Sequence, residues 1–239
     1  MSFCPKSDLL LLVFYICLTS CDQGVIEVSL PLPPIIEQIE PLTETDGLLI
    51  RWRSNRSLDL DSYRIYRTSA GREQILLAKI GQNQTRWEDE AAPLEVESIY
   101  RVASVNIDQQ QGHLSEPVAY TLIRKPAPVA PKDQTKLEHH PTFRWLGTDQ
   151  LGGYSLRLFV HDEEDVLNSV SPDSIPQTPY REIWRYETID FERFSVDFNL
   201  DQAATENLME GKLYRWRIDF SAGENVGSYS KWRFFRFTG

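Results

Sequence analysis

The chain has 239 residues, of which 35 are acidic and 25 are basic, so its formal net charge is -10. Hydrophobic residues make up 41% and charged residues 25%, a balance that is typical of globular rather than disordered proteins. The acidic excess argues against a nucleic-acid partner, because binding a phosphate backbone needs clustered Lys and Arg. The mean hydropathy of -0.39 excludes a polytopic membrane protein.

Residues 1–20 are predicted to be a lipoprotein signal peptide. The ten residues from Leu9 to Leu18 are apolar and uncharged. A spanning helix needs about 20 such residues, whereas ten suit the hydrophobic region of a secretory signal. Leu18-Thr19-Ser20-Cys21 follows directly and resembles the lipobox of bacterial lipoproteins. The resemblance implies cleavage before Cys21, a palmitate-type acyl anchor on its thiol and a place in the bacterial cell envelope.

Cysteine usage agrees with lipidation of Cys21. The cysteines are Cys4, Cys17 and Cys21, so a mature chain beginning at Cys21 has a single thiol and no internal disulfide. An ordinary signal peptide that has a cysteine near its cleavage site is the alternative. Each buried CH₂ contributes about 0.8 kcal/mol, so several acyl chains would hold the protein stably in a bilayer. Asp22 resembles an enteric inner-membrane retention signal, but other bacteria do not follow that rule, so the choice between inner and outer membrane stays open.

The mature chain divides into two units joined by proline-rich segments. Residues 21–33 contain Pro31 and Pro33 and are expected to be a tether. Residues 125–130 alternate proline with other residues, which favours a stiff, extended spacer. The units are therefore expected at 34–124 and 131–239, each the size of one small sandwich.

Both units are predicted to be all-β, because their apolar residues alternate with polar ones in short runs that end at Gly, Pro, Asn or Asp. One or two helical turns are expected at 201–209 and no other helix. The strands expected in the first unit are 48–53, 63–67, 75–80, 85–88, 100–106 and 118–123.

The first unit resembles a bacterial fibronectin type III module. The matching motifs, in family order, are Leu49-Ile50-Arg51-Trp52, Tyr63-Arg64-Ile65-Tyr66, Trp87-Glu88-Asp89, Tyr100 to Asn106, and Gly112, Ser115 and Pro117. The resemblance implies that Trp52 fills a core between two sheets. The family's tyrosine corner pairs a Leu with a Tyr six residues later, as Leu94 and Tyr100 do, but alignment on Val105-Asn106 places Ser98 there instead.

The second unit is similar to a divergent copy of the first, which indicates an internal repeat. Phe143-Arg144-Trp145 takes the place of the core tryptophan strand, and Leu208 and Tyr214 have the spacing of the corner. The fold expected is thus two tandem immunoglobulin-like, fibronectin type III-like β-sandwiches after a signal peptide. An insertion at about 163–179 separates two strands of the second unit.

Aromatic residues are concentrated in the second unit, which holds 18 of them against 6 in the first. One sandwich core is not expected to bury all 18, so some aromatic surface should be covered by other side chains or exposed for binding. The candidate partner-binding residues are Trp184, Tyr186, Tyr229 and Trp232.

Stacking of arginines on the aromatics is the competing interpretation. Arg215 and Arg217 alternate with Tyr214 and Trp216 on one strand. Tyr229-Ser230-Lys231-Trp232 is similar to a degraded Trp-Ser-x-Trp-Ser box of cytokine receptors, in which arginines interleave with aromatics of the next strand. Such stacks contribute about 0.5–2 kcal/mol each.

The motifs point away from catalysis. The sequence has no Gly-x-Ser-x-Gly, no His-Glu-x-x-His and no phosphate-binding glycine loop. The acidic run after His161 lacks the ligand spacing of a calcium loop. No enzyme, cofactor or metal is therefore expected. The function expected is a membrane-anchored, non-catalytic scaffold for an envelope protein partner. The alternatives are a polysaccharide-binding accessory module and, more remotely, a hydrolase with its site at 163–179.

Overall fold

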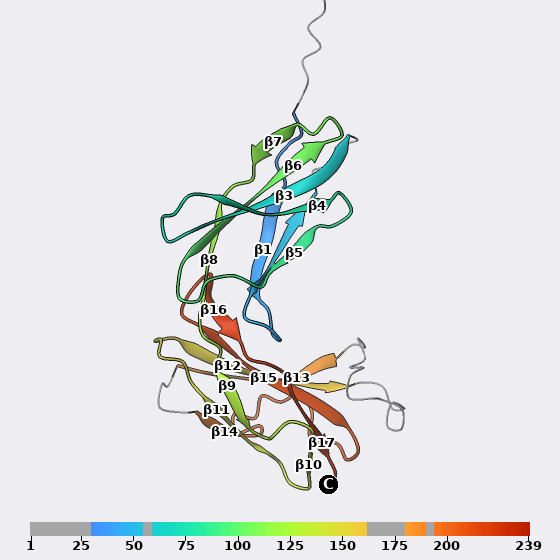
Figure 1. Cartoon of the computed structure of the whole chain (residues 1–239). Coiled ribbons are helices and arrows are strands. Elements are labelled where there is room, and N and C mark those ends of the chain that lie inside the picture. The colour runs from blue at the N-terminus through green and yellow to red at the C-terminus, as the bar shows by residue number, and fades with distance from the viewer. Residues whose placement is uncertain (1–29, 55–58, 162–179, 190–193) are drawn as a thin grey trace, which may run out of the picture.

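The computed structural model describes residues 30–54, 59–161, 180–189 and 194–239. These residues form two β-sandwiches placed end to end, with the C-terminus in the sandwich farther from residue 30 (Figure 1). No helix occurs among the described residues. The expected all-β fold with two sandwiches is confirmed.

The first sandwich packs a three-stranded sheet against a larger one. Its small sheet has the order β1-β2-β5, and in its large sheet β3 lies between β4 and β6, while β7 and β8 both pair with β6. The strands are β1 (Ile35–Pro41), β2 (Leu48–Arg53), β3 (Leu60–Ser69), β4 (Ile75–Gly81), β5 (Arg86–Asp89), β6 (Ser98–Asn106), β7 (Gln111–Leu114) and β8 (Val118–Leu122).

The core of the first sandwich is built around Trp52 and Tyr63, whose ring centroids are 5.4 Å apart. Tyr100 is fully buried, and its hydroxyl donates a hydrogen bond of 2.7 Å to the Asp89 carboxylate. Leu94 is 38% exposed, so it does not pair with Tyr100 in the core. Tyr100 thus occupies the interior position of β6, and its hydroxyl is held by a carboxylate.

The second sandwich repeats this arrangement with one addition. Its small sheet has the order β14-β11-β9; in its large sheet β12 lies between β13 and β15, β16 and β17 pair with β15, and β10 pairs parallel with β17. The strands are β9 (Ala127–Ala130), β10 (Thr135–Leu137), β11 (Thr142–Leu146), β12 (Gly153–His161), β13 (Tyr180–Thr188), β14 (Ser195–Asp197), β15 (Leu213–Ser221), β16 (Val226–Tyr229) and β17 (Arg233–Phe237).

Most aromatic side chains of the second sandwich lie in its core, although not all 18 are buried there. Phe143 is at the centre, with ring centroids of Trp184 and Trp216 at 5.8 and 5.0 Å. Tyr214 is buried, and its hydroxyl accepts a hydrogen bond from the Met209 main-chain N–H at 2.8 Å, as expected for a tyrosine corner. The other buried aromatics are Trp145, Tyr154, Phe198, Phe220, Phe235 and Phe237.

Residues 201–209 form turns and extended chain, so the helical turns expected there are absent. The Asn199 side-chain oxygen accepts a hydrogen bond from the Ala204 main-chain N–H, and the Asp201 carboxylate accepts one from that of Ala203. Thr205 N–H donates to Ile183 of β13. Short polar side chains that bond nearby main-chain groups compete with helix formation, and here they prevent it.

The proline-rich segment is also not a free spacer. Residues 127–130 form β9, which pairs antiparallel with β11 and belongs to the second sandwich. Its one proline, Pro128, is tolerated because β9 is an edge strand, where a missing N–H leaves no central hydrogen bond unmade.

Candidate functional site

The predicted anchor cannot be placed in the structure. Cys21, the signal peptide and residues 163–179 lie outside the described residues. At the end of the tether, Pro31 is buried against the first sandwich, where its carbonyl lies so close to Gly112 that a side chain there would clash. No helix in the described ranges is long and apolar enough to cross a membrane.

The two sandwiches are joined by a shared sheet edge. Strand β8 pairs parallel with β16 across the boundary. Thr121 N–H donates to the Asn225 carbonyl at 2.8 Å, and Ile123 N–H donates to the Gly227 carbonyl at 3.0 Å. The Ser228 hydroxyl adds a bond of 3.2 Å to the Arg124 carbonyl. The large sheets of the two sandwiches are therefore continuous at this boundary, which we call the junction.

Lys125 makes a second set of contacts at the junction. Its ammonium donates hydrogen bonds to the carbonyls of Leu42, Thr43 and Thr45, at 2.7, 2.8 and 2.6 Å, in the loop between β1 and β2. Burial lowers the pKa of Lys125 to about 8, while Asp46 and Glu44 favour its charged form. At neutral pH the side chain is thus protonated, and its hydrogen bonds connect the linker to the first sandwich.

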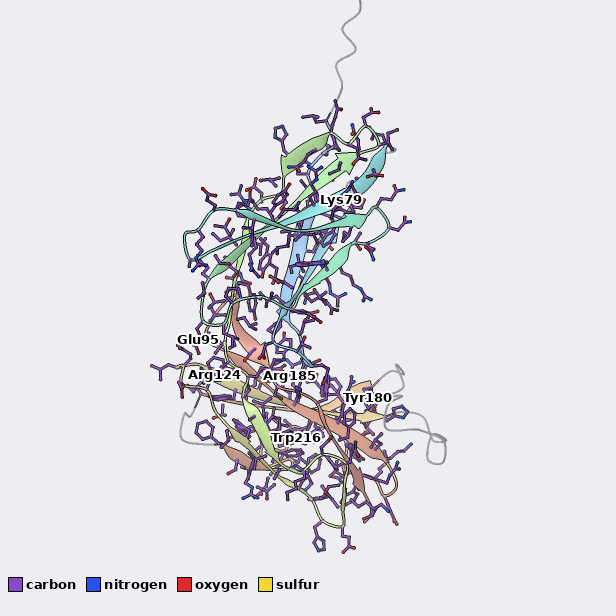
Figure 2. All side chains as sticks on the ribbon, in the orientation of Figure 1. Lys79, Glu95, Arg124, Tyr180, Arg185 and Trp216 are labelled. Carbon is purple, nitrogen blue, oxygen red and sulfur yellow. The ribbon has the colours of Figure 1, made fainter. Side chains whose placement is uncertain are left out.

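A cleft of about 660 Å³ lies at the junction. On the first sandwich it is lined by Gln38 to Glu40 of β1 and by Tyr120 of β8. On the second it is lined by side chains of β12, β13, β15 and β16, including Arg185, which Figure 2 shows at the boundary between the sandwiches. The volume falls in the range of about 300–1,000 Å³ that is usual for small-molecule sites.

The charged groups around the cleft form ion pairs. Arg217 Nε lies 2.7 Å from an Asp219 oxygen, and Arg157 lies 3.7 Å from the other. Arg185 and Arg157 both contact Glu182. Burial raises the pKa of Asp219, and the guanidinium of Arg217 opposes that rise most strongly.

On the first sandwich, Arg51 pairs with Glu40 at 3.2 Å. Apart from Glu187, the charged side chains that line the cleft are therefore already paired with groups of opposite charge.

An arginine ladder covers the outer face of the large sheet beside the cleft. We use this name for Tyr180, Arg215, Trp232, Arg217 and Tyr229. The Arg215 guanidinium carbon lies 3.8 Å from the Tyr180 ring centroid and 4.2 Å from that of Trp232. The corresponding distances from Arg217 are 4.2 Å to Tyr229 and 4.6 Å to Trp232. The expectation of arginine–aromatic stacking is confirmed.

The four candidate partner-binding residues do not form one exposed aromatic face. Trp184 is 1% exposed, and its indole N–H donates to Asp201, so its assignment to a surface was wrong. Tyr186 is partly buried and packs on Trp184 with ring centroids 6.0 Å apart. Tyr229 and Trp232 are partly buried in the arginine ladder, and Tyr229 also lines the cleft.

A bulge explains the error at Trp184. The pairing of β12 with β13 shifts register between Leu158 and Phe159, so Ile183 and Trp184 are both buried although they are adjacent.

Sequence reasoning did not find the cleft, because its walls come from both units. The nearest available signal was the i, i+2 pair Arg217 and Asp219, which places a guanidinium and a carboxylate on the same face of one strand. Nothing in that spacing shows that Glu40 and Tyr120 of the first unit lie close to it.

Comparison of the sequence with protein-family models and with curated proteins finds no match. Among solved structures, the chain is similar to the FN1-FN3 domains of chicken CNTN1, with 15% identity, 88% of this chain and 68% of that chain covered, and a TM-score of 0.36. A segment of two fibronectin type III domains of chicken tenascin is 15% identical, with 85% of this chain and 97% of that chain covered and a TM-score of 0.31. A β-1,2-glucanase from Parabacteroides distasonis is 22% identical, with 41% of this chain and 14% of that chain covered and a TM-score of 0.34. The match therefore spans only a small part of that enzyme.

These likenesses concern the fold alone. The strand order defines the fold, because in each unit a three-stranded sheet faces a larger one. In the larger sheet, β3 pairs with β6 in the first unit and β12 pairs with β15 in the second. Both units are fibronectin type III-like β-sandwiches.

Proposed function

We propose that the chain is a cell-envelope lipoprotein, held in the membrane by acyl chains on Cys21, whose two sandwiches form a non-catalytic scaffold for a protein partner. The Leu18 to Cys21 motif supports the anchor. The junction supports the scaffold, and it is the observation on which the proposal depends.

The junction supports a scaffold because it fixes the two sandwiches relative to each other. Main-chain hydrogen bonds between β8 and β16 and the three bonds of Lys125 connect different parts of the boundary. A surface that is already in its binding arrangement loses less conformational entropy when a partner binds. A preformed two-sandwich body therefore suits recognition better than two modules on a flexible linker.

The position of the N-terminal tether indicates how the two sandwiches would be oriented relative to the membrane. Residues 30–34 lie at the end of the first sandwich that is farthest from the second (Figure 1). An anchor at Cys21 would therefore place the first sandwich nearer the bilayer and present the second to partners. Tyr186, Tyr229 and Trp232 remain the proposed contact residues, now as partly buried side chains rather than protruding ones.

The anchor is tested by comparing Cys21→Ala with Cys17→Ala in cells. The wild type and Cys17→Ala should partition into detergent and carry the mass of the acyl groups, because Cys17 leaves with the signal peptide. Cys21→Ala should lose both properties. Wild-type protein that is processed with an unmodified Cys21 would contradict the anchor.

The partner is tested by photo-crosslinking in intact cells. A photoreactive residue is placed at Tyr186 and, as a control on another surface, at the exposed Gln84 of the first sandwich. We expect a discrete crosslinked envelope protein from position 186 and none from position 84. The same crosslinks from both positions, or none from either, would contradict the proposed contact surface.

A further inference from the structure

The cleft offers hydrogen-bonding groups that the fold does not use. The hydroxyls of Tyr120, Tyr229 and Ser155 and the carboxylate of Glu187 line it, and within the described ranges none of them has a hydrogen-bond partner. Tyr120 is 8% exposed, so it is otherwise a core residue of the first sandwich whose hydroxyl end faces the boundary. Unused polar groups from both sandwiches therefore meet in one place.

The two tyrosines share the cleft with the carboxylates of Asp219 and Glu40. Burial is the largest cause that raises the pKa of Tyr120, followed by the charges of Tyr229, Asp219 and Glu40. Tyr229 has its pKa raised by burial and then by Asp219. Two phenols and two carboxylates from opposite walls thus act on each other across the cleft.

The charges of the cleft disfavour an ionic ligand. A cation would meet Arg157 and Arg185, and an anion would meet Glu40, Glu187 and Asp219. Most of these groups are already in ion pairs, and separating a pair in a partly buried site leaves a charge without compensation. A neutral ligand can accept and donate hydrogen bonds there without breaking the pairs.

On β12 and β15, the free groups suit a ligand with hydroxyls better than a peptide main chain. Ser155, Arg157 and Asp219 lie on β12 and β15, whose main chains are paired on both sides at these positions. Side-chain hydroxyls and carboxylates are therefore what these strands offer a ligand. Sugar hydroxyls both donate and accept, as the phenols and Ser155 do.

We propose that the cleft at the junction binds a neutral oligosaccharide, held by the hydroxyls of Tyr120 and Tyr229 and by the carboxylate of Glu187. The site goes beyond the proposed protein scaffold and does not depend on it. Because the junction fixes both walls, the site is formed before the ligand arrives.

The test uses the full mature chain with Cys21→Ser, titrated by calorimetry. The neutral probes are the hexasaccharides of β-1,2-, β-1,3-, β-1,4- and α-1,4-linked glucose and of β-1,4-linked xylose. Hexagalacturonate is the anionic probe and a glucosamine hexamer the cationic one. We expect at least one neutral probe to bind in the millimolar range or tighter, and both charged probes to bind at least about ten-fold more weakly.

Variants locate the binding. Tyr120→Phe and Tyr229→Phe keep the rings and remove one hydroxyl each, and each should weaken the neutral probe by about two- to ten-fold. Glu187→Gln should weaken it similarly. Glu138→Gln, which changes an exposed carboxylate between β10 and β11 that does not line the cleft, should leave binding unchanged. Thermal unfolding confirms that each variant is folded.

Three results would overturn the proposal: no binding of any neutral probe, equal binding of a charged probe, or unchanged binding by the folded Tyr120→Phe/Tyr229→Phe double variant. A peptide library that binds the cleft in place of the sugars would do the same. None of these results bears on the anchor, since the protein used here carries no acyl chain.

Discussion

At the scale of single residues, neighbouring side chains decide whether an aromatic serves the core or the surface. Trp184 illustrates this, because its ring packs against Phe143 and Phe198 while its indole N–H donates a hydrogen bond to Asp201. Its apolar surface and its polar atom are both accounted for inside the second sandwich. Its role is therefore packing, and any effect on binding should come through stability.

Replacing Trp184 by Ala should reduce the free energy of unfolding by about 3–5 kcal/mol, the usual cost of a large aromatic cavity. Tyr186→Ala, at a partly buried position on the same strand, should cost less. Chemical denaturation of both variants measures the difference. A Trp184→Ala protein as stable as the wild type would show that the indole is not a core residue.

Buried tyrosines predict a sensitivity to alkaline pH. Burial raises the pKa of Tyr120, as it does that of Tyr100. Because the folded pKa lies above the unfolded value of about 10, the contribution to stability is complete below pH 10 and is lost as the pH rises above it. The unfolded chain releases its proton first, so alkali favours unfolding.

The Tyr120→Phe variant should lose this part of the pH dependence. Between pH 10 and 11 the wild-type free energy of unfolding should fall by about 1 kcal/mol more than that of Tyr120→Phe. Urea unfolding at half-unit pH intervals gives both curves. Parallel curves for the two proteins would mean that the phenol is not shielded from solvent in the folded state.

At the scale of elements, both sandwiches have a serine between the last two strands of the chain segment that forms them. Between β7 and β8, the Ser115 hydroxyl accepts a bond from Val102 N–H at 3.0 Å and donates to the Glu116 carbonyl. Between β16 and β17, the Ser230 hydroxyl accepts from Ile218 N–H at 2.9 Å and donates to the Lys231 carbonyl. The same pair of serine hydrogen bonds therefore occurs at the equivalent position in both sandwiches.

Ser115→Ala and Ser230→Ala should each cost about 1–3 kcal/mol, because each leaves a buried main-chain N–H without an acceptor. Ser221→Ala, at an exposed position, should cost much less. Thermal unfolding of the three variants ranks them. If either buried variant matched Ser221→Ala, its hydroxyl would not be satisfying that N–H.

Much at this scale could be predicted from sequence, for physical reasons. The short apolar runs at β2, β3 and β6 were correctly predicted to be strands, although burial alternates only in the first half of β6 and most of β2 is buried on both faces. The bulge at Trp184 could not be read, because it depends on the partner strand β12. The short strand β9 was hidden for a similar reason, since proline content signals an extended chain but not whether another strand lies beside it.

At the scale of the whole molecule, the junction could not be predicted from local patterns. The residues that form it are far apart in sequence, as Lys125 and the loop at 42–45 show. The cleft follows from the junction, because Tyr120 and Asp219 share it only when the sandwiches hold one relative orientation. Both the proposed scaffold and the proposed saccharide site therefore require a rigid boundary.

The most direct test of this rigidity is a distance distribution between spin labels, one at Gln84→Cys in the first sandwich and one at Glu138→Cys in the second. Both sites are exposed, and Cys21→Ser removes the remaining thiol of the mature chain. Pulsed electron resonance should give one narrow peak, which Lys125→Ala should broaden by removing the three bonds to the loop at 42–45. A broad distribution in the protein with Lys125 intact would contradict the account.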